Sequence, residues 1–229
     1  MNSQLPDLVV ERLSKCGVVA VLVVDEAKDA VPLAHALLEG GIDAMELTLR
    51  TPTALEALGA ITSQVPEMLA GIGTILAPGQ VEQVYEAGAA FGVAPGMNPR
   101  TVQAAQKVGL PFAPGIVTPS DLELALEWGC RDVKFFPAEP AGGFKYLKSL
   151  AAPYAHLGTR FVPLGGLTQA NMAAYLTSPL VLAVGGSWLA PRDLIQANDW
   201  EAIRNRASAA RQAVDQLGAD RPRVDRSGG

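Results

Sequence analysis

The sequence predicts one α/β domain, a (β/α)8 barrel of the TIM type with an extra N-terminal helix. Short runs rich in Val, Ile, Leu and Ala alternate with amphipathic segments along the chain, which is the pattern of repeated strand–helix units in a parallel sheet. No composition break or long linker interrupts this alternation, and 229 residues suit such a barrel as a single domain. An open doubly wound sheet, which usually needs fewer strands, is the alternative.

The elements are expected as one helix followed by strands and helices in alternation. Strands are expected at short apolar runs, and helices where apolar residues recur at helical spacing, often closed by glycine. Gly40 and Gly41 are expected to end one of these helices in a left-handed conformation. The expected strands cover residues 18–24, 43–49, 68–74, 91–94, 111–115, 132–136, 160–166 and 180–186. The expected helices cover residues 8–15, 28–41, 52–64, 78–87, 99–108, 120–128, 144–151, 169–176 and 200–217, with a short helical turn at 187–189.

The domain is expected to span residues 1–218. Residues 219–229 show no apolar period, and terminal segments of this kind are commonly disordered. The sequence therefore predicts a disordered tail after the last helix.

The charge and the scarcity of metal-type ligands argue against several classes of function. The net charge of -5 disfavours a nucleic-acid surface, which needs clustered Lys and Arg. No apolar run is long enough for a signal peptide or a membrane span, so a cytoplasmic protein without membrane contact is expected. Cys16, Cys130 and the two histidines are scattered, which indicates neither a disulfide framework nor a metal site. The usual dinucleotide and ATP signals, GxGxxG and GxxxxGK(S/T), do not occur.

The stretch "MELTLR" places Glu46, Thr48 and Arg50 at alternate positions, with apolar residues between them. Strand side chains alternate between two faces, and the apolar face of a barrel strand packs against the helices. The polar set is therefore expected to point into the barrel, near the carboxyl ends of the strands where such barrels carry their active sites. The alternatives are a solvent-facing strand of an antiparallel sheet, or a buried Glu46–Arg50 pair with a purely structural role.

The same alternation in "DVKFF" turns Lys134 inward, and this is the single lysine of six that falls in an expected strand. Burial in a low-dielectric pocket favours the neutral form of an amine. A neutral amine can attack a ketone and form an imine, whose protonated nitrogen accepts electrons from a breaking carbon–carbon bond. The alternative is a structural lysine paired with Glu46.

Small residues gather at the ends of three further strands. "GIGT" places Thr74 at the mouth of the barrel, beside glycines that would let a ligand approach the backbone. The runs "PLGG" and "AVGGS" fall at the seventh and eighth strands, where barrels often bind phosphate through backbone N–H groups and the start of a short helix. As isolated signals these glycines could also be ordinary turn residues. The predicted phosphate site comprises Gly165, Gly166, Gly185, Gly186 and Ser187.

The order of motifs resembles one enzyme family. The runs "ELTLR", "GIGT", "APG", "PGIVTPSD", "VKFFPAEPAGG", "PLGG" and "VGGSWL" occur in that order, and together they resemble the class I 2-keto-3-deoxy-6-phosphogluconate (KDPG) aldolases, also described as 4-hydroxy-2-oxoglutarate (KHG) aldolases. The resemblance implies a barrel, a homotrimer, and no metal or organic cofactor. It also implies small-molecule partners, a phosphorylated keto-sugar acid and pyruvate.

By this resemblance, the lysine and the glutamate carry the chemistry and the other residues bind substrate. Lys134 would form the Schiff base and Glu46 would be the general acid and base. Arg50 and Thr74 would bind the pyruvyl carboxylate, and Pro95 and Phe136 would line the pocket. The distal phosphate would be held by Gly165, Gly166, Gly186 and Ser187.

One residue departs from the family's pattern. Gluconate-specific members usually read "PTGG" where this chain reads "PLGG", so Leu164 replaces a threonine hydroxyl in the pocket. Loss of a hydroxyl can weaken discrimination between epimers that differ at one carbon. The expected activity is cleavage of KDPG to pyruvate and glyceraldehyde 3-phosphate, with 4-hydroxy-2-oxoglutarate as a further candidate substrate. The alternatives are a 2-keto-3-deoxy-6-phosphogalactonate aldolase, an oxaloacetate decarboxylase, a non-aldolase phosphate-binding barrel and a catalytically silent binding barrel.

Overall fold

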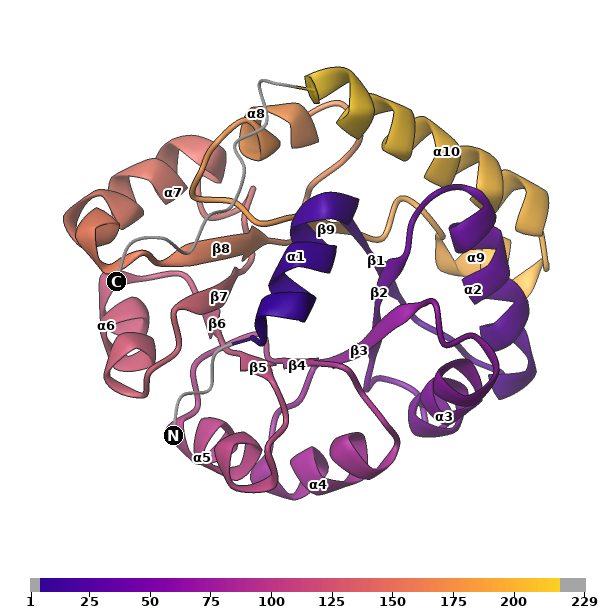
Figure 1. The fold of residues 1–229 in the computed structure, drawn as a ribbon, viewed down its shortest axis with the longest axis horizontal. Helices are drawn as coiled ribbons and strands as arrows, with labels where there is room; N and C mark the ends of the chain where they lie inside the picture. The colour runs from indigo at the N-terminus through magenta and orange to yellow at the C-terminus, as the bar shows by residue number, and fades with distance from the viewer. Residues whose placement is uncertain (1–4, 219–229) are drawn as a thin grey trace.

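A computed structural model describes residues 5–218 of the chain. Short parallel strands curve around the centre of the molecule, with helices outside them and α1 lying across the middle (Figure 1). The predicted disordered tail, residues 219–229, lies outside the described residues. The strands are β1 Val18–Leu22, β2 Ala44–Thr48, β3 Leu69–Gly73, β4 Gly92–Val93, β5 Phe112–Ala113, β6 Gly115–Ile116, β7 Asp132–Phe135, β8 Arg160–Pro163 and β9 Val184–Gly186.

The predicted helices are present close to their expected positions, whereas α9 and η2 were not predicted. The α-helices are α1 Asp7–Cys16, α2 Ala30–Glu39, α3 Ala54–Gln64, α4 Pro78–Glu86, α5 Pro99–Val108, α6 Pro119–Glu127, α7 Gly143–Ala151, α8 Met172–Leu176, α9 Arg192–Gln196 and α10 Trp200–Leu217, and the 3-10 helices are η1 Ala27–Asp29 and η2 Ala152–Leu157. The bounds of α5 agree with the prediction because its end signals are strong. Asn98 accepts a hydrogen bond from the Arg100 amide, Pro99 opens the helix, and Gly109 closes it with φ 80°.

The strands pair in parallel in two groups. One group has the order β5-β4-β3-β2-β1-β9 and the other has the order β6-β7-β8. Isolated bridges, Phe161 to Val181 and Leu164 to Gly185, join β8 to the β9 segment. On the other side, the Lys134 amide donates to the Pro114 carbonyl between β5 and β6. The structure is therefore a curved parallel sheet with helices around it, as an α/β fold requires.

Three local predictions were wrong. The expected fifth strand divides into β5 and β6 at Pro114, because proline has no N–H to donate to a neighbouring strand. Only Gly41 is left-handed, with φ 83°, whereas Gly40 has φ -80°. Residues 187–189 form a turn rather than a helical turn, and the next helix, α9, begins only after Pro191.

The alternation of side chains in β2 and β7 agrees with the prediction. Met45, Leu47, Val133 and Phe135 are each no more than 1% exposed, and the Phe135 ring stacks on the Tyr146 ring of α7 at a centroid distance of 6.2 Å. The apolar face therefore packs against the helices, which leaves the other face for the centre of the molecule.

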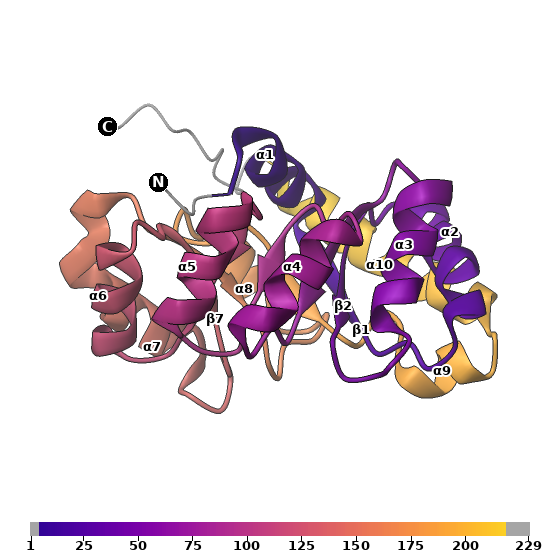
Figure 2. The same cartoon turned by 90° about the horizontal axis from the view of Figure 1, so that it is seen from below.

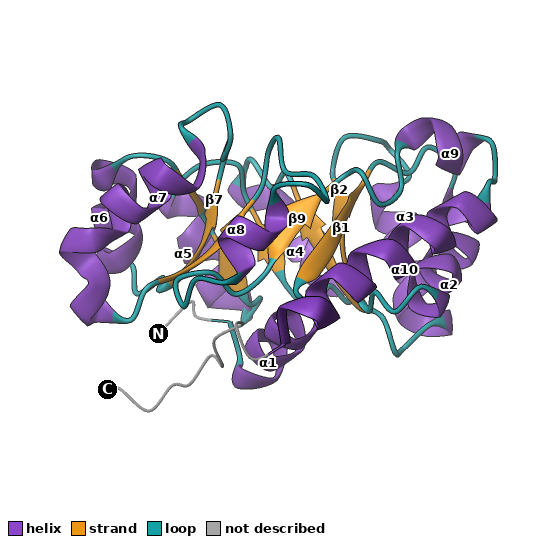
Figure 3. Ribbon diagram, turned by 90° about the horizontal axis from the view of Figure 1, so that it is seen from above, coloured by secondary structure: helices purple, strands orange, loops and turns teal. Residues whose placement is uncertain are grey.

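Helix α1 lies on one face of the strand layer, and the loop that follows β7 lies on the opposite face (Figures 2 and 3). Arg12 of α1 donates to the Asp43 carboxylate and to the Glu67 carbonyl. Arg211 of α10 donates to the Lys15 and Cys16 carbonyls at the end of α1. These contacts fix the helix against the amino ends of the strands. None of the helices between residues 5 and 218 combines the length and apolar character that a membrane span needs.

Candidate active site

A cleft of about 300 Å³ opens at the carboxyl ends of the strands. Every residue that the sequence singled out as catalytic or substrate-binding lines it. They are Glu46, Arg50, Thr74, Pro95, Lys134, Phe136, Leu164, Gly165, Gly166, Gly185, Gly186 and Ser187. Strands far apart in the chain therefore contribute to one site, as expected for the carboxyl edge of a parallel sheet.

Lys134 and Glu46 meet at the floor of this cleft. The Lys134 Nζ donates to the Glu46 Oε1 at 2.9 Å, and the two side chains are only 7% and 4% exposed. They come from β7 and β2, so 88 residues separate them in sequence. The Lys134 Nζ also lies 5.5 Å from the centroid of the Phe136 ring. The amine is thus enclosed between a carboxylate and an aromatic face, with the cleft as its opening to substrate.

The backbone around Lys134 is hydrogen-bonded on both sides. The Lys134 amide donates to the Pro114 carbonyl at 2.9 Å, and the Leu164 amide donates to the Phe135 carbonyl at 2.9 Å. β7 is thereby held between β6 and β8. A side chain on such a strand keeps its position more accurately than one on a loop.

Glycines of β3 make room for neighbouring side chains, including the Glu46 carboxylate, rather than for a ligand. A Cβ atom at Gly73 would overlap the Glu46 carboxylate, and one at Gly71 would overlap the Phe91 ring. The sequence prediction that these glycines open the wall to substrate is therefore wrong. Gly73 instead allows Glu46 to lie flat beside β3.

Arg50 and Thr74 lie at the rim of the cleft. Arg50 is exposed and follows the end of β2, where its amide donates to the Thr48 carbonyl at 2.7 Å. Thr74 has φ 63°, a left-handed conformation that is rare for a β-branched residue and costs on the order of 1 kcal/mol or more. Strained backbone of this kind concentrates at functional sites. The two residues follow neighbouring strands, β2 and β3, and both line the cleft.

The glycine loop after β8 presents backbone to the cleft. Gly165 and Gly166 have φ 96° and 81°, and consecutive residues of this kind can direct N–H groups toward a bound anion. At the end of β9, a Cβ atom on Gly185 would collide with Leu164, and one on Gly186 with the Trp188 ring. Because no helix begins at Ser187, any anion held here would depend on loop N–H groups and not on a helix N-terminus, which corrects the sequence-based prediction.

Four lining residues were missed as site residues: Val21, Val23, Thr48 and Leu167. The sequence predicts Thr48 on the inward face with Glu46 and Arg50, but Thr48 has a structural role. Its hydroxyl donates to the Leu22 carbonyl at 2.9 Å and so ties β2 to β1. Val21, Val23 and Leu167 are apolar, so nothing in their chemistry marks them as site residues. Val21 pairs with Glu46 across β1 and β2, which would identify it as a site residue only once the strand register is known.

A second, much smaller cavity lies behind the same pair. Its volume is about 20 Å³, and apart from Glu46 and Lys134 its walls are entirely apolar. Leu5 and Leu13, from the N-terminal segment, close it from below and are each 2% exposed. The other lining residues are Val19, Phe91, Val93, Ala113, Val162 and Leu164.

Within residues 5–218, no group of three or more His, Cys, Asp or Glu residues lies close enough together to hold a metal ion. The two cysteines, Cys16 and Cys130, are both buried and are not joined in a disulfide. Burial raises the pKa of the Cys16 thiol to about 11, with Asp43 adding to the effect. A thiol with a raised pKa is a poor nucleophile.

The chain is similar in sequence to known aldolases. Over residues 9–206 the chain matches the family described as KDPG and KHG aldolase. The KHG/KDPG aldolase of Escherichia coli strain K12 is 44% identical over 198 residues, which cover 86% of this chain and 91% of that protein.

Two solved structures show the same fold. One is the KDPG aldolase from Legionella pneumophila with pyruvate captured at low pH as a covalent carbinolamine intermediate; its TM-score is 0.83, its identity is 38%, and the match covers 88% of this chain and 97% of that one. The other is the KDPG aldolase of Zymomonas mobilis ZM4 with 3-phosphoglycerate, at a TM-score of 0.81, 38% identity and coverage of 88% and 94%. With a matching family over most of its length, and relatives of this similarity, the chain belongs to the KDPG and KHG aldolase family.

Proposed function

We propose that this protein is a class I aldolase that cleaves KDPG to pyruvate and glyceraldehyde 3-phosphate through an imine on Lys134. The observation that carries the proposal is the buried contact of 2.9 Å between the Lys134 Nζ and the Glu46 Oε1 at the floor of the cleft. An amine and a proton acceptor at this distance are what imine chemistry requires. The covalent carbinolamine in the Legionella pneumophila relative supports the same chemistry.

The first half of the reaction forms the imine. The Lys134 ammonium gives a proton to Glu46, and the free amine attacks the C2 ketone of the substrate to form a carbinolamine. Protonation of the C2 hydroxyl by Glu46 and loss of water then give an iminium ion. Glu46 is left as a carboxylate, close enough to Lys134 to act on the adduct without moving far.

The second half breaks the C3–C4 bond. Glu46 removes the proton of the C4 hydroxyl, the bonding electrons move to the iminium nitrogen, and C4 leaves as the aldehyde of glyceraldehyde 3-phosphate. The remaining enamine takes that proton back from Glu46 at C3, and water hydrolyses the resulting iminium to release pyruvate and return Lys134 to its ammonium form. Each proton needed in this half passes through a single carboxylate, as general acid–base catalysis allows.

The two ends of the cleft suit the two charged ends of this substrate. Arg50 and Thr74, at one side of the opening, would bind the carboxylate, since a guanidinium pairs well with a planar anion. Gly165, Gly166, Gly186 and Ser187, at the other side, would bind the phosphate through backbone N–H groups. Pro95 and Phe136 would line the middle of the cleft. The 3-phosphoglycerate in the Zymomonas mobilis relative supports a phosphate-binding role for the family site.

A second candidate substrate is the 6-phosphogalactonate epimer. Leu164 is 4% exposed and lines the cleft, so it offers no hydrogen-bonding group where a hydroxyl could distinguish the two epimers. 4-Hydroxy-2-oxoglutarate, which has no phosphate, is a further candidate, because the E. coli relative is named for both activities.

The proposal is tested by a steady-state assay with KDPG, its galactonate epimer and 4-hydroxy-2-oxoglutarate, in which pyruvate and the aldehyde product are measured together. We expect equal amounts of the two products and the highest kcat/KM with a phosphorylated substrate. A protein that binds phosphorylated sugar acids but releases no pyruvate would be a non-aldolase barrel and would contradict the proposal.

We also propose that residues 1–218 form a single closed (β/α)8 barrel, that the chains assemble as homotrimers, and that the protein is cytoplasmic. The bridges between β8 and the β9 segment support closure of the sheet. The trimer follows from the family resemblance alone, and light scattering coupled to gel filtration tests it directly.

A further inference from the structure

The glycine loop after β8 is held from one side by the chain that leaves the catalytic strand. The Ala138 amide donates to the Leu164 carbonyl at 2.7 Å, and the Glu139 amide donates to the Gly165 carbonyl at 3.0 Å. Glu139 lies only five residues after Lys134. The backbone of the β7–α7 loop therefore fixes the position of the glycine loop relative to the Lys134 amine.

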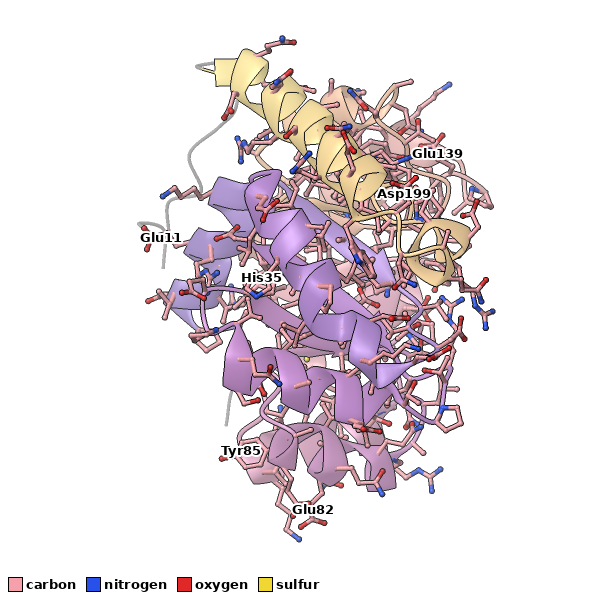
Figure 4. All side chains as sticks on the ribbon, turned by 90° about the vertical axis from the view of Figure 1, so that its right-hand side faces the viewer. Glu11, His35, Glu82, Tyr85, Glu139 and Asp199 are labelled. Atoms are coloured by element: carbon pink, nitrogen blue, oxygen red, sulfur yellow. The ribbon has the colours of Figure 1, made fainter. Side chains whose placement is uncertain are left out.

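The Glu139 side chain covers the second glycine of this loop. A Cβ atom on Gly166 would lie 2.7 Å from the Glu139 Cβ, so only glycine fits beneath it. The Glu139 Oε1 accepts a hydrogen bond from the Tyr175 hydroxyl of α8. Glu139 is exposed and is not among the residues that line the cleft. Glu139 and Glu11 of α1 lie on opposite faces of the molecule (Figure 4). Glu139 is on the face where the carboxyl ends of the strands lie.

Tyr175 is a fixed anchor for this carboxylate. Its side chain is 1% exposed, and its ring contacts the Phe144 ring of α7 at a centroid distance of 5.3 Å. Burial, and then the hydrogen bond to Glu139, raise the pKa of the Tyr175 phenol. A raised pKa favours the protonated hydroxyl, the form that donates to Glu139.

The glycine loop is also held from its other end. The Asn171 Nδ2 donates to the Gly166 carbonyl at 3.3 Å, and the Asn171 Oδ1 accepts from the Thr168 amide at 2.7 Å. Asn171 directly precedes α8, and Tyr175 lies one turn later on that helix. One short helix thus contacts the loop directly through Asn171 and indirectly through Tyr175 and Glu139.

We propose that Glu139 and Tyr175 are positioning residues for phosphate recognition: their hydrogen bond holds Gly165 and Gly166 in the conformation that directs their N–H groups toward the substrate phosphate. This rests on the proposed function of the glycine loop. The same bond keeps the Glu139 carboxylate, which would repel a phosphate, turned toward α8. Neither residue touches the reacting atoms, so the pair acts on binding of the phosphorylated end and not on imine formation.

The test is Tyr175→Phe, which keeps the ring contact with Phe144 and removes only the hydroxyl. We expect KM for KDPG to rise roughly 10-fold with little change in kcat, because a hydrogen bond to a charged group is lost and uniform binding is weakened. The pyruvate concentration that gives half-maximal borohydride trapping should stay the same, since pyruvate carries no phosphate.

Tyr154→Phe is the matched control. The Tyr154 hydroxyl also donates to a glutamate, the Glu123 Oε1 at 2.8 Å, but it does so at an exposed position on the outer helices. This variant should leave both constants unchanged. Glu139→Gln keeps an acceptor for Tyr175 and should stay near the wild type in KM, whereas Glu139→Ala should resemble Tyr175→Phe. The double variant Glu139→Ala, Tyr175→Phe should be no worse than either single variant, because both remove one bond.

Binding of glycerol 3-phosphate, measured by calorimetry, gives a readout that does not depend on turnover. Weaker binding by Tyr175→Phe supports the proposal even if the wild-type protein forms no pyruvate adduct, and in that case only the aldolase function fails. An unchanged Kd and an unchanged KM would overturn the proposal. Equal losses for KDPG, glycerol 3-phosphate and pyruvate would also overturn it, since they would indicate a general structural role.

Discussion

Lys134 and Glu46 separate two spaces that differ in size and in chemistry. On the side of the strand ends lies a cleft of about 300 Å³ lined by charged, hydroxyl and glycine residues. On the side of α1 lies a cavity of about 20 Å³ whose other walls are apolar. A space of that volume could hold about one water molecule, but apolar cavities of this kind generally stay dry.

Because of this difference, Lys134 and Glu46 have polar surroundings on the side of the cleft only. A proton that leaves the amine has an acceptor in Glu46 and further partners in the cleft, but none among the apolar residues below. Leu5 and Leu13 keep the lower side closed, and Arg12 ties α1 to the chain around β2 and β3.

The largest effect is expected from Lys134→Arg. Arginine keeps a positive charge beside Glu46 but has no amine that can form an imine at neutral pH. Turnover of KDPG should fall on the order of 10⁴-fold or more, the scale seen when a covalent nucleophile is removed. Lys148→Arg is the control, because Lys148 also lies over an aromatic ring, Phe144 at 5.1 Å, but on the outer helix α7. Retained activity in Lys134→Arg would rule out the covalent role.

Glu46→Gln should have the next largest effect. The amide keeps the shape of the carboxylate and can still accept a hydrogen bond from Lys134, but it cannot accept a proton. We expect kcat to fall about 10²- to 10⁴-fold, the usual contribution of a general acid–base group. A kcat within a few-fold of the wild type would mean that another group moves the protons.

Leu13→Ala enlarges the lower cavity without touching the cleft. Removal of a buried leucine side chain should lower the free energy of unfolding by about 2–5 kcal/mol, measured by urea denaturation. Leu8→Ala on the same helix is the control, because Leu8 is 69% exposed and its removal should change stability by less than about 0.5 kcal/mol. Equal effects of the two substitutions would contradict the role of Leu13 as a seal.

The smallest effect is expected from Leu164→Thr, at the residue that lines both spaces. A hydroxyl there should shift the ratio of kcat/KM toward the gluconate epimer by roughly 2- to 10-fold, the value of one neutral hydrogen bond. Leu164→Val, similar in size to threonine but without the hydroxyl, separates shape from hydrogen bonding. The idea fails if the valine and threonine variants show the same ratio.

The sequence predicted the cleft well because its residues follow simple rules. Alternation within "MELTLR" and "DVKFF" identified which side chains of β2 and β7 point inward, and the order of strands placed them at a common edge. The match of α5 with its predicted bounds likewise reflects strong local signals, Asn98 with Pro99 at one end and Gly109 at the other. Side-chain alternation and helix end signals are local features of the sequence, so they can be recognised without knowledge of tertiary contacts.

The lower cavity could not be predicted in the same way. Leu13 has the pattern of an ordinary apolar residue in an amphipathic helix, and Leu5 precedes that helix. Only the docking of the N-terminal segment brings them beneath Lys134. The role of Gly73 depends on a contact with Glu46 across β2 and β3. The division of β5 from β6 depends on how Pro114, which has no N–H to donate, meets the neighbouring strands. The hydrogen bond between Glu139 and Tyr175 likewise joins the loop after β7 to helix α8, a pairing that no local sequence pattern encodes.

The central claim is that a buried amine, Lys134, forms the covalent bond to the substrate. Incubation with pyruvate followed by borohydride reduction and peptide mapping tests it most directly. We expect one reduced pyruvyl group per chain, located on Lys134 and lost in Lys134→Arg. An unmodified protein, or a pyruvyl group on any other lysine, would contradict it.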